Sequence, residues 1–231
     1  MAIKGNVLKR MAVVAVTTLV MGAVSAAALP LPIYDGTDVD MYLKQNTFPS
    51  GLSEEKVYLD AAKASAITGH VGSQTDTRLV TFSSTTDTLD AKNGFATIKA
   101  VDDYLNNITI TAPGYWFEDL IFSVNLTPNS NTDLSVVAKD KSGGTDTFAN
   151  WASLSDWGPG ENRILVLSDT GTLMQSVTIN SQLGIGSLAG LDQLKQIQIS
   201  GLQPVPEPAS MLLLGAGLLG LAGFRKKIFK K

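Results

Sequence analysis

Alternating apolar and polar positions run through the central part of this chain in short segments. In a strand with one buried face, every second side chain points into the core and is apolar, and the residues between them are polar. Such segments, or runs of β-branched and aromatic residues, occupy 78–83, 94–99, 107–111, 115–127, 133–139, 163–168, 174–180 and 193–200. Clusters of Gly, Pro, Asn and Asp separate them and favour turns. The pattern predicts about eight to ten strands without intervening helices.

Strands that follow one another in this way predict a mostly β domain, an antiparallel β-sandwich of jelly-roll-like form, over residues 29–203. Its first part, 29–53, is rich in Pro, Asp and Gly, and we expect it to be irregular. Residues 53–56 could begin a helix with Ser53 as the N-cap, but a strand through 56–61 fits nearly as well. The sequence leaves that choice open.

The first 28 residues have the three parts of a secretory signal peptide. Three basic residues precede an apolar run, 11–24, which we expect to form the signal helix, and small residues follow at 25–28. Cleavage after Ala28 satisfies the small-x-small rule, and cleavage after Ala26 does so nearly as well. A retained anchor is the alternative, but the run is short for a membrane span. The sequence therefore predicts export.

The other end, 204–231, has three successive parts. Residues 205–208 read Val-Pro-Glu-Pro, and prolines that lack an amide proton exclude a helix interior or a central strand there. An apolar transmembrane helix is expected over 209–224. Its stretch from Met211 to Phe224 carries no charge and would span roughly 21 Å, less than the ~30 Å hydrocarbon core. The basic end, 225–231, favours retention on the cytoplasmic side.

Residues 205–227 resemble the PEP-CTERM sorting signal, also called the ice-binding protein C-terminal domain. The resemblance rests on a Pro-Glu-Pro motif, a Gly/Leu-rich helix and a basic stop, which here are Pro206, Glu207 and Pro208, the helix 209–224, and Arg225, Lys226 and Lys227. It implies a Gram-negative bacterium with an exosortase, a membrane enzyme that recognises the Pro-Glu-Pro motif and cuts at or near it. Segments 69–74 and 114–122 also resemble a pattern that recurs among PEP-CTERM proteins.

This resemblance implies an address for the protein. The chain would be exported, held transiently in the inner membrane by its tail, and then transferred to the cell surface or the extracellular matrix. Exopolysaccharide is the partner class that this location suggests. An ice-binding face is not expected, because the Thr-x-Thr pairs of the chain stand at irregular spacing without a repeat.

Charge and composition exclude other functions. Eight of the 18 Lys and Arg residues lie at the two ends, so residues 29–208 hold 10 of them against all 21 Asp and Glu, a net charge of 10 − 21 = −11. A polyanion of this kind is repelled by nucleic acid, which we exclude as a partner. The chain has no cysteine, so thiolate catalysis, thiolate metal sites and disulfides are excluded.

Candidate catalytic groups are few. His70 is the single histidine, and a lone imidazole builds neither a His-rich metal site nor, without a nucleophile motif, a convincing triad. Adjacent acids such as Glu118 and Asp119 leave a carbohydrate-active hydrolase with a carboxylate pair as the alternative function. Most acids of this chain lie in predicted turns, where Asp commonly accepts backbone hydrogen bonds. We therefore expect a non-enzymatic protein without a cofactor.

Two binding hypotheses remain. Asp35, Asp38 and Asp40 cluster in an acidic turn that could hold a structural calcium ion, although the spacing does not match an EF-hand. Trp151 and Trp157 flank a loop with polar neighbours and could stack on a sugar ring, the alternative being that they close one end of the domain. Trp116 lies in a strand-like run and is expected in the core.

Overall fold

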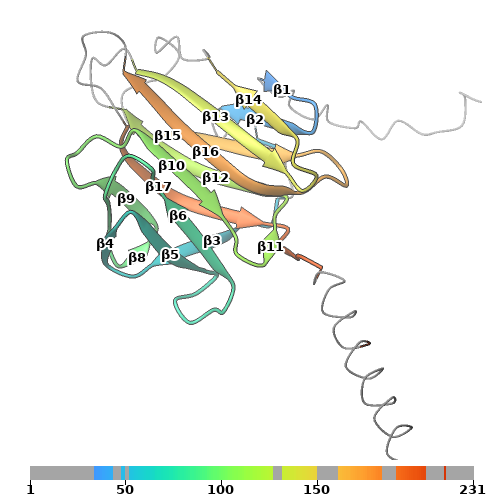
Figure 1. The fold of residues 1–231 in the computed structure, drawn as a ribbon, viewed down its shortest axis with the longest axis horizontal. Helices are drawn as coiled ribbons and strands as arrows, with labels where there is room; N and C mark the ends of the chain where they lie inside the picture. Colours follow the sequence, from blue (N-terminus) through green and yellow to red (C-terminus); the bar gives the residue numbers. More distant parts are fainter. Residues whose placement is uncertain are drawn as a thin grey trace, which may run out of the picture. The chain divides into compact units, whose positions relative to one another are not determined.

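The computed structural model describes residues 34–43, 48–49, 52–126, 132–149, 161–183, 191–206 and 216. The chain divides into two compact units, Met1–Leu31 and Pro32–Lys231, and the described residues belong to the second. They form antiparallel strands (Figure 1). These are β1 (Tyr34–Asp35), β2 (Val39–Leu43), β3 (Glu55–Leu59), β4 (Ala62–Ala64), β5 (Ala66–Val71), β6 (Leu79–Ser83), β7 (Leu89–Ala91), β8 (Gly94–Phe95), β9 (Thr97–Ala100), β10 (Asn107–Thr111), β11 (Tyr115–Trp116), β12 (Asp119–Leu126), β13 (Thr132–Asp140), β14 (Thr145–Phe148), β15 (Glu161–Ser168), β16 (Met174–Leu183), β17 (Leu191–Ser200) and β18 (Gln203–Pro204).

Most strands follow one another in a single hydrogen-bonded path, β1-β2-β15-β12-β17-β3-β5-β6-β10-β16-β13-β14. Strand β3 joins the two halves of that path. Its start pairs with β17 through Glu55 and Lys56, and the rest pairs with β5 from Val57 to Leu59. The short strands β4, β7, β8 and β9 extend the sheet beside β3 and β17.

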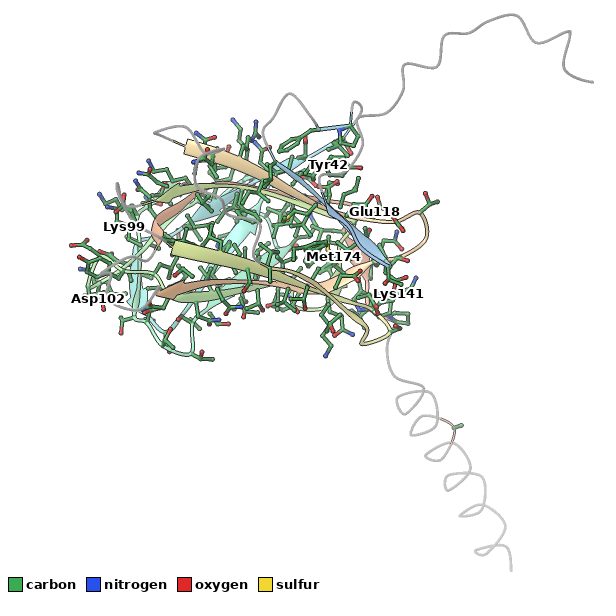
Figure 2. The ribbon with its side chains drawn as sticks, turned by 90° about the horizontal axis from the view of Figure 1, so that it is seen from above. Tyr42, Lys99, Asp102, Glu118, Lys141 and Met174 are labelled. Carbon is green, nitrogen blue, oxygen red and sulfur yellow. The ribbon has the colours of Figure 1, made fainter. Side chains whose placement is uncertain are left out.

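The inward side chains of both halves form one core. Its members come from nearly every long strand, and the largest fully buried ones include Phe82, Phe117 and Phe122. Figure 2 shows the strands in two layers with side chains between them, where Met174 lies. Burial of each such side chain contributes about 1.5–3 kcal/mol. The alternating apolar positions of the sequence therefore supply the core.

The two ends of the strand path meet at Asp146 in β14. Its carboxylate accepts hydrogen bonds from the backbone amides of Thr37, Asp38 and Val39, at 3.1, 2.9 and 2.9 Å, in the turn between β1 and β2. Gly36 makes this turn possible, because a Cβ there would lie 2.1 Å from the carbonyl oxygen of Val39. The arrangement is consequently almost barrel-like.

The predicted mostly β, antiparallel class is confirmed, and strands occupy each of the eight predicted segments. Of the two readings of residues 53–61, the strand is correct. The expectation that 29–53 is irregular is wrong for β1 and β2, whose hydrogen bonds come from distant partners that local composition does not reveal. The segment 115–127 contains two strands, β11 and β12, rather than one.

The predicted signal helix and nearly all of the predicted transmembrane helix lie outside the described residues. Ala216, described by itself, is helical and exposed. Within the described part of the chain, no helix is long and apolar enough to cross a membrane.

Candidate functional site at the base of the sorting segment

The folded domain holds the start of the tail as a strand. In β18, Pro204 pairs with Tyr115 of β11 and Gln203 pairs with Trp116. One residue further, the amide of Val205 donates to the carbonyl oxygen of Gly114 at 2.9 Å. Because prolines have no amide proton, Val205 supplies the only N–H between residues 204 and 206. Pro206 follows and is exposed, so the first residue of the Pro-Glu-Pro motif stands next to this hydrogen bond.

Strand β11, which pairs with the start of the tail, is held by a turn before it and by a buried residue after it. Gly114 has a φ of 79°, a conformation that other residues rarely adopt, and the Tyr115 amide closes the turn onto the carbonyl of Ala112 at 2.9 Å. Phe117 is fully buried, and its amide and carbonyl both bond to Met174. The expectation that Trp116 lies in the core is wrong, because its strand pairs with β18 at the edge of the domain and the residue is only half-buried.

Glu118 supports the chain as it leaves β17. Its amide donates to the carbonyl of Ser200 at 3.0 Å, and its carboxylate accepts from the Gln203 side chain at 3.2 Å. Between these two contacts Gly201 has a φ of 62°, and a Cβ on it would lie 2.4 Å from Cγ of Glu118. A glycine is therefore required where the chain passes over Glu118 toward the sorting segment.

The neighbouring acid, Asp119, is buried. Its side chain is 2% exposed, and desolvation raises its pKa to about 6. A hydrogen bond donated by the hydroxyl of Ser200 to Oδ2 opposes that rise, whereas the charges of Glu54 and Glu118 add to it. Its Oδ1 is buried without a hydrogen-bond partner. Because Glu118 is exposed and Asp119 is closed to solvent, the structure does not present the two carboxylates together.

Most of the site residues predicted from sequence lie outside the described part of the chain. This applies to Glu207, Pro208, Arg225, Lys226, Lys227, Ala28, Trp151 and Trp157. Pro206 is the described member of the sorting motif. The predicted cleavage, stacking and basic-stop roles stay predictions.

The acidic turn Asp35–Asp40 is described in part. The backbone amides of Asp38 and Val39 in this turn donate to the carboxylate of Asp146. Among the residues that the structure describes, no three His, Asp or Glu side chains gather closely enough to hold a metal ion. The calcium hypothesis for Asp35, Asp38 and Asp40 stays a prediction. Sequence reasoning missed Asp146, and no local signal marks it.

His70 and the segment after it form a structural hairpin. Its Nδ1 lies 2.8 Å from the carbonyl oxygen of Asp76, and its Nε2 lies 3.7 Å from the carboxylate of Asp60. Arg78 bonds to Asp76 and to Glu55 of β3, which holds the pKa of the Asp76 carboxyl down at about 2. These contacts fix the connection between β5 and β6. His70 is thus a half-buried residue of strand β5 with a structural role.

Pro204, Val205 and Pro206 are exposed where the chain leaves the edge of the domain, and in the sequence an apolar stretch and a basic end follow them. This order is typical of a C-terminal sorting signal. The PEP-CTERM protein-sorting motif matches residues 204–227, so the chain carries that motif and is an exosortase-targeted exported protein. The match begins at Pro204, the last residue of β18. No curated protein and no solved structure matches this chain.

Proposed function

We propose that this protein is a non-enzymatic component of the cell surface or extracellular matrix of a Gram-negative bacterium, where it associates with exopolysaccharide. The observation that carries the proposal is the position of the sorting motif. It begins where the last strand of the folded domain ends, so an exosortase that cuts near Glu207 would release or transfer the β domain intact. We assign that domain to the jelly-roll-like sandwich type.

The charge of the domain supports an extracellular role with a carbohydrate partner. A net charge of −11 over residues 29–208 keeps the domain soluble and away from anionic lipid and nucleic acid after processing. A neutral polysaccharide carries no charge that such a domain would repel.

Processing is tested with Glu207→Ala in the producing bacterium, with Val205→Ala as a control that keeps Pro206, Glu207 and Pro208. Mass spectrometry of the surface form should find the wild type and the control shortened to about residue 208, whereas Glu207→Ala should keep its tail. Intact Lys231 on the surface-exposed wild-type protein would contradict the proposal.

Matrix association is tested in the same cells. The processed protein should fractionate with the exopolysaccharide and be released when that polymer is digested by a glycosidase. The processed protein could instead stay wholly in the medium, whether or not polymer is present. That result would overturn the proposed association with exopolysaccharide and leave the sorting assignment unchanged.

The alternative is a carbohydrate-active hydrolase with Asp119 as its general acid. The pKa of Asp119, about 6, would suit that role near neutral pH, but the residue is 2% exposed and would have to become accessible to a sugar. Release of reducing sugar from matrix glycans by the purified chain, abolished in Asp119→Asn, would establish this alternative. Its failure with folded protein leaves the non-enzymatic proposal in place.

A further inference from the structure

Six adjacent strands, β5, β6, β10, β16, β13 and β14, turn one face away from the core (Figure 1). Their inward residues are buried, and the alternate positions are exposed or half-buried. We call these outward positions the open face. They are mainly hydroxyl and amide side chains: Thr68, Thr81, Ser83, Asn107, Thr109, Thr111, Ser135, Val137, Lys139, Thr145, Thr147, Ser176, Thr178 and Asn180, with Ala66, His70 and Leu79 on the two strands at one margin.

The register of the strands aligns these side chains into rows. One row runs Thr68, Thr81, Thr111, Ser176, Lys139 and Thr145, and the next runs Ala66, Ser83, Thr109, Thr178, Val137 and Thr147. Asn107, Asn180 and Ser135 begin a third row. In a sheet of this kind neighbours in a row are about 4.8 Å apart and rows are about 6.8 Å apart. The face is therefore a two-dimensional array of hydroxyl groups.

Hydrogen bonds between the side chains order the centre of the array. The hydroxyls of Thr109 and Thr178 lie 2.9 Å apart, and Asn107 donates to Asn180 at 2.6 Å. Threonine is stiff about χ1 because it is branched at Cβ, so little rotamer freedom is lost when a ligand binds. A hydroxyl that uses one lone pair or its proton in such a bond keeps capacity for another partner.

Charge distinguishes the open face from the rest of the domain. Among the positions named above none is Asp or Glu, and Lys139 is their one permanent charge, although residues 29–208 together carry −11. Asp133 lies on the same side of β13 as Ser135, at the end of the face and away from its centre. A neutral polymer meets no charge to desolvate at the centre of the face, whereas an anionic polymer is repelled by the surrounding carboxylates. A second copy of the chain would bury few apolar side chains there, and stable interfaces need an apolar core.

We infer that the open face binds a neutral, hydroxyl-rich polysaccharide, with Thr81, Thr109, Thr111 and Thr178 at the centre of the contact. Each hydroxyl donates to and accepts from the ring hydroxyls of the polymer, and the rows bind successive sugars along a chain. This inference rests on the proposed function only in taking exopolysaccharide as the class of partner.

The test is affinity electrophoresis of the full chain, purified in mild detergent, through gels that contain hydroxyethyl cellulose as the neutral probe or alginate as the anionic probe. The variant Thr109→Val/Thr178→Val removes two central hydroxyls and keeps the β-branched shape. Thr97→Val, in strand β9 away from the open face, is the matched control. Circular dichroism and the thermal midpoint establish that each protein is folded.

We expect the wild type and Thr97→Val to be retarded by hydroxyethyl cellulose and not by alginate. Each lost hydroxyl should weaken binding roughly fivefold, so the double variant should lose most of its retardation. Equal retardation of the folded double variant, or retardation by alginate alone, would overturn the inference. The inference would also be overturned if the wild type were a dimer in solution and the double variant a monomer, because the open face would then be the interface between two copies of the chain.

These outcomes are separable from those of the proposed function. Loss of retardation in the double variant concerns the open face, whereas Glu207→Ala concerns processing and leaves every residue of the open face in place. A wild type that is processed correctly but is not retarded by neutral polymer would overturn the inference and leave the sorting assignment standing.

Discussion

The two outer surfaces of this β domain differ, although both consist of outward side chains of antiparallel strands. On one of them, Tyr42, Ile121 and Leu165 form a small second apolar cluster, and Phe48, Leu52 and Leu167 pack against it. We call it the covered face. Figure 2 shows Tyr42 on the outside of its layer. On the open face the corresponding positions are hydroxyls and amides, and alternate side chains stay accessible.

The difference shows what alternation does and does not decide. Alternation assigns half of the side chains to the core, and the fate of the other half depends on the residues that lie over them. Where outward positions are Ile and Leu, a segment of the chain must cover them because exposed apolar surface is unfavourable. Where they are Thr, Ser and Asn, no apolar cover is needed, and such a face suits a partner of its own polarity.

The largest expected effect is on the covered face. Leu165→Ala removes a fully buried side chain from the second cluster and should lower the free energy of unfolding by about 2–5 kcal/mol. The matched change on the open face, Thr178→Val, should alter it by less than about 1 kcal/mol because that side chain is half-buried. Urea titration of both variants measures the contrast. Similar losses at the two positions would break the distinction between the faces.

A pH dependence is expected from Asp119, which also lies on the covered side of β12, beside Ser200. Its pKa is about 6 in the folded chain and 3.8 in its unperturbed state, so the folded chain holds the proton more tightly. This contribution to stability is complete below about pH 4 and is lost as the pH rises through 6, on the order of 3 kcal/mol in total.

Asp119→Asn should remove that dependence, because the amide stays neutral. Urea midpoints of the wild type and the variant should approach each other near pH 4 and diverge above pH 6, with the variant the more stable. Thermal scans give an independent measure. Parallel curves from pH 4 to pH 8 would mean that Asp119 is ionised with an ordinary pKa.

A smaller effect is expected at Asp146, where the edge strands of the two faces meet. Asp146→Ala leaves the amides of Thr37, Asp38 and Val39 without their acceptor and should cost about 1–3 kcal/mol. Hydrogen exchange at these three amides should accelerate more than exchange in the core strands. Asp146→Asn keeps one acceptor oxygen and should lose less, whereas unchanged exchange in Asp146→Ala would disprove the link.

Some features could be predicted from the sequence because their signals are local. The alternation at 107–111 identifies β10 with its full length, and the runs at 163–168 and 174–180 identify β15 and β16. The order of proline motif, apolar stretch and basic end identifies the sorting motif. Each depends on neighbouring residues along the chain, so composition and period were sufficient.

Other features depend on register and long-range pairing, which only the tertiary structure decided. Thr81, Thr109 and Thr178 have irregular spacing in the sequence, yet strand pairing places them in adjacent rows of one face. The bonds from Asp146 to the turn at 37–39 span more than 100 residues, and the attachment of β18 to β11 spans almost 90. The sequence by itself determined the strands that have strong local alternation and the sorting signal of this protein. Its folding determined which of the outward faces is covered and where the sorting segment leaves the domain, because those depend on contacts between residues far apart in the chain.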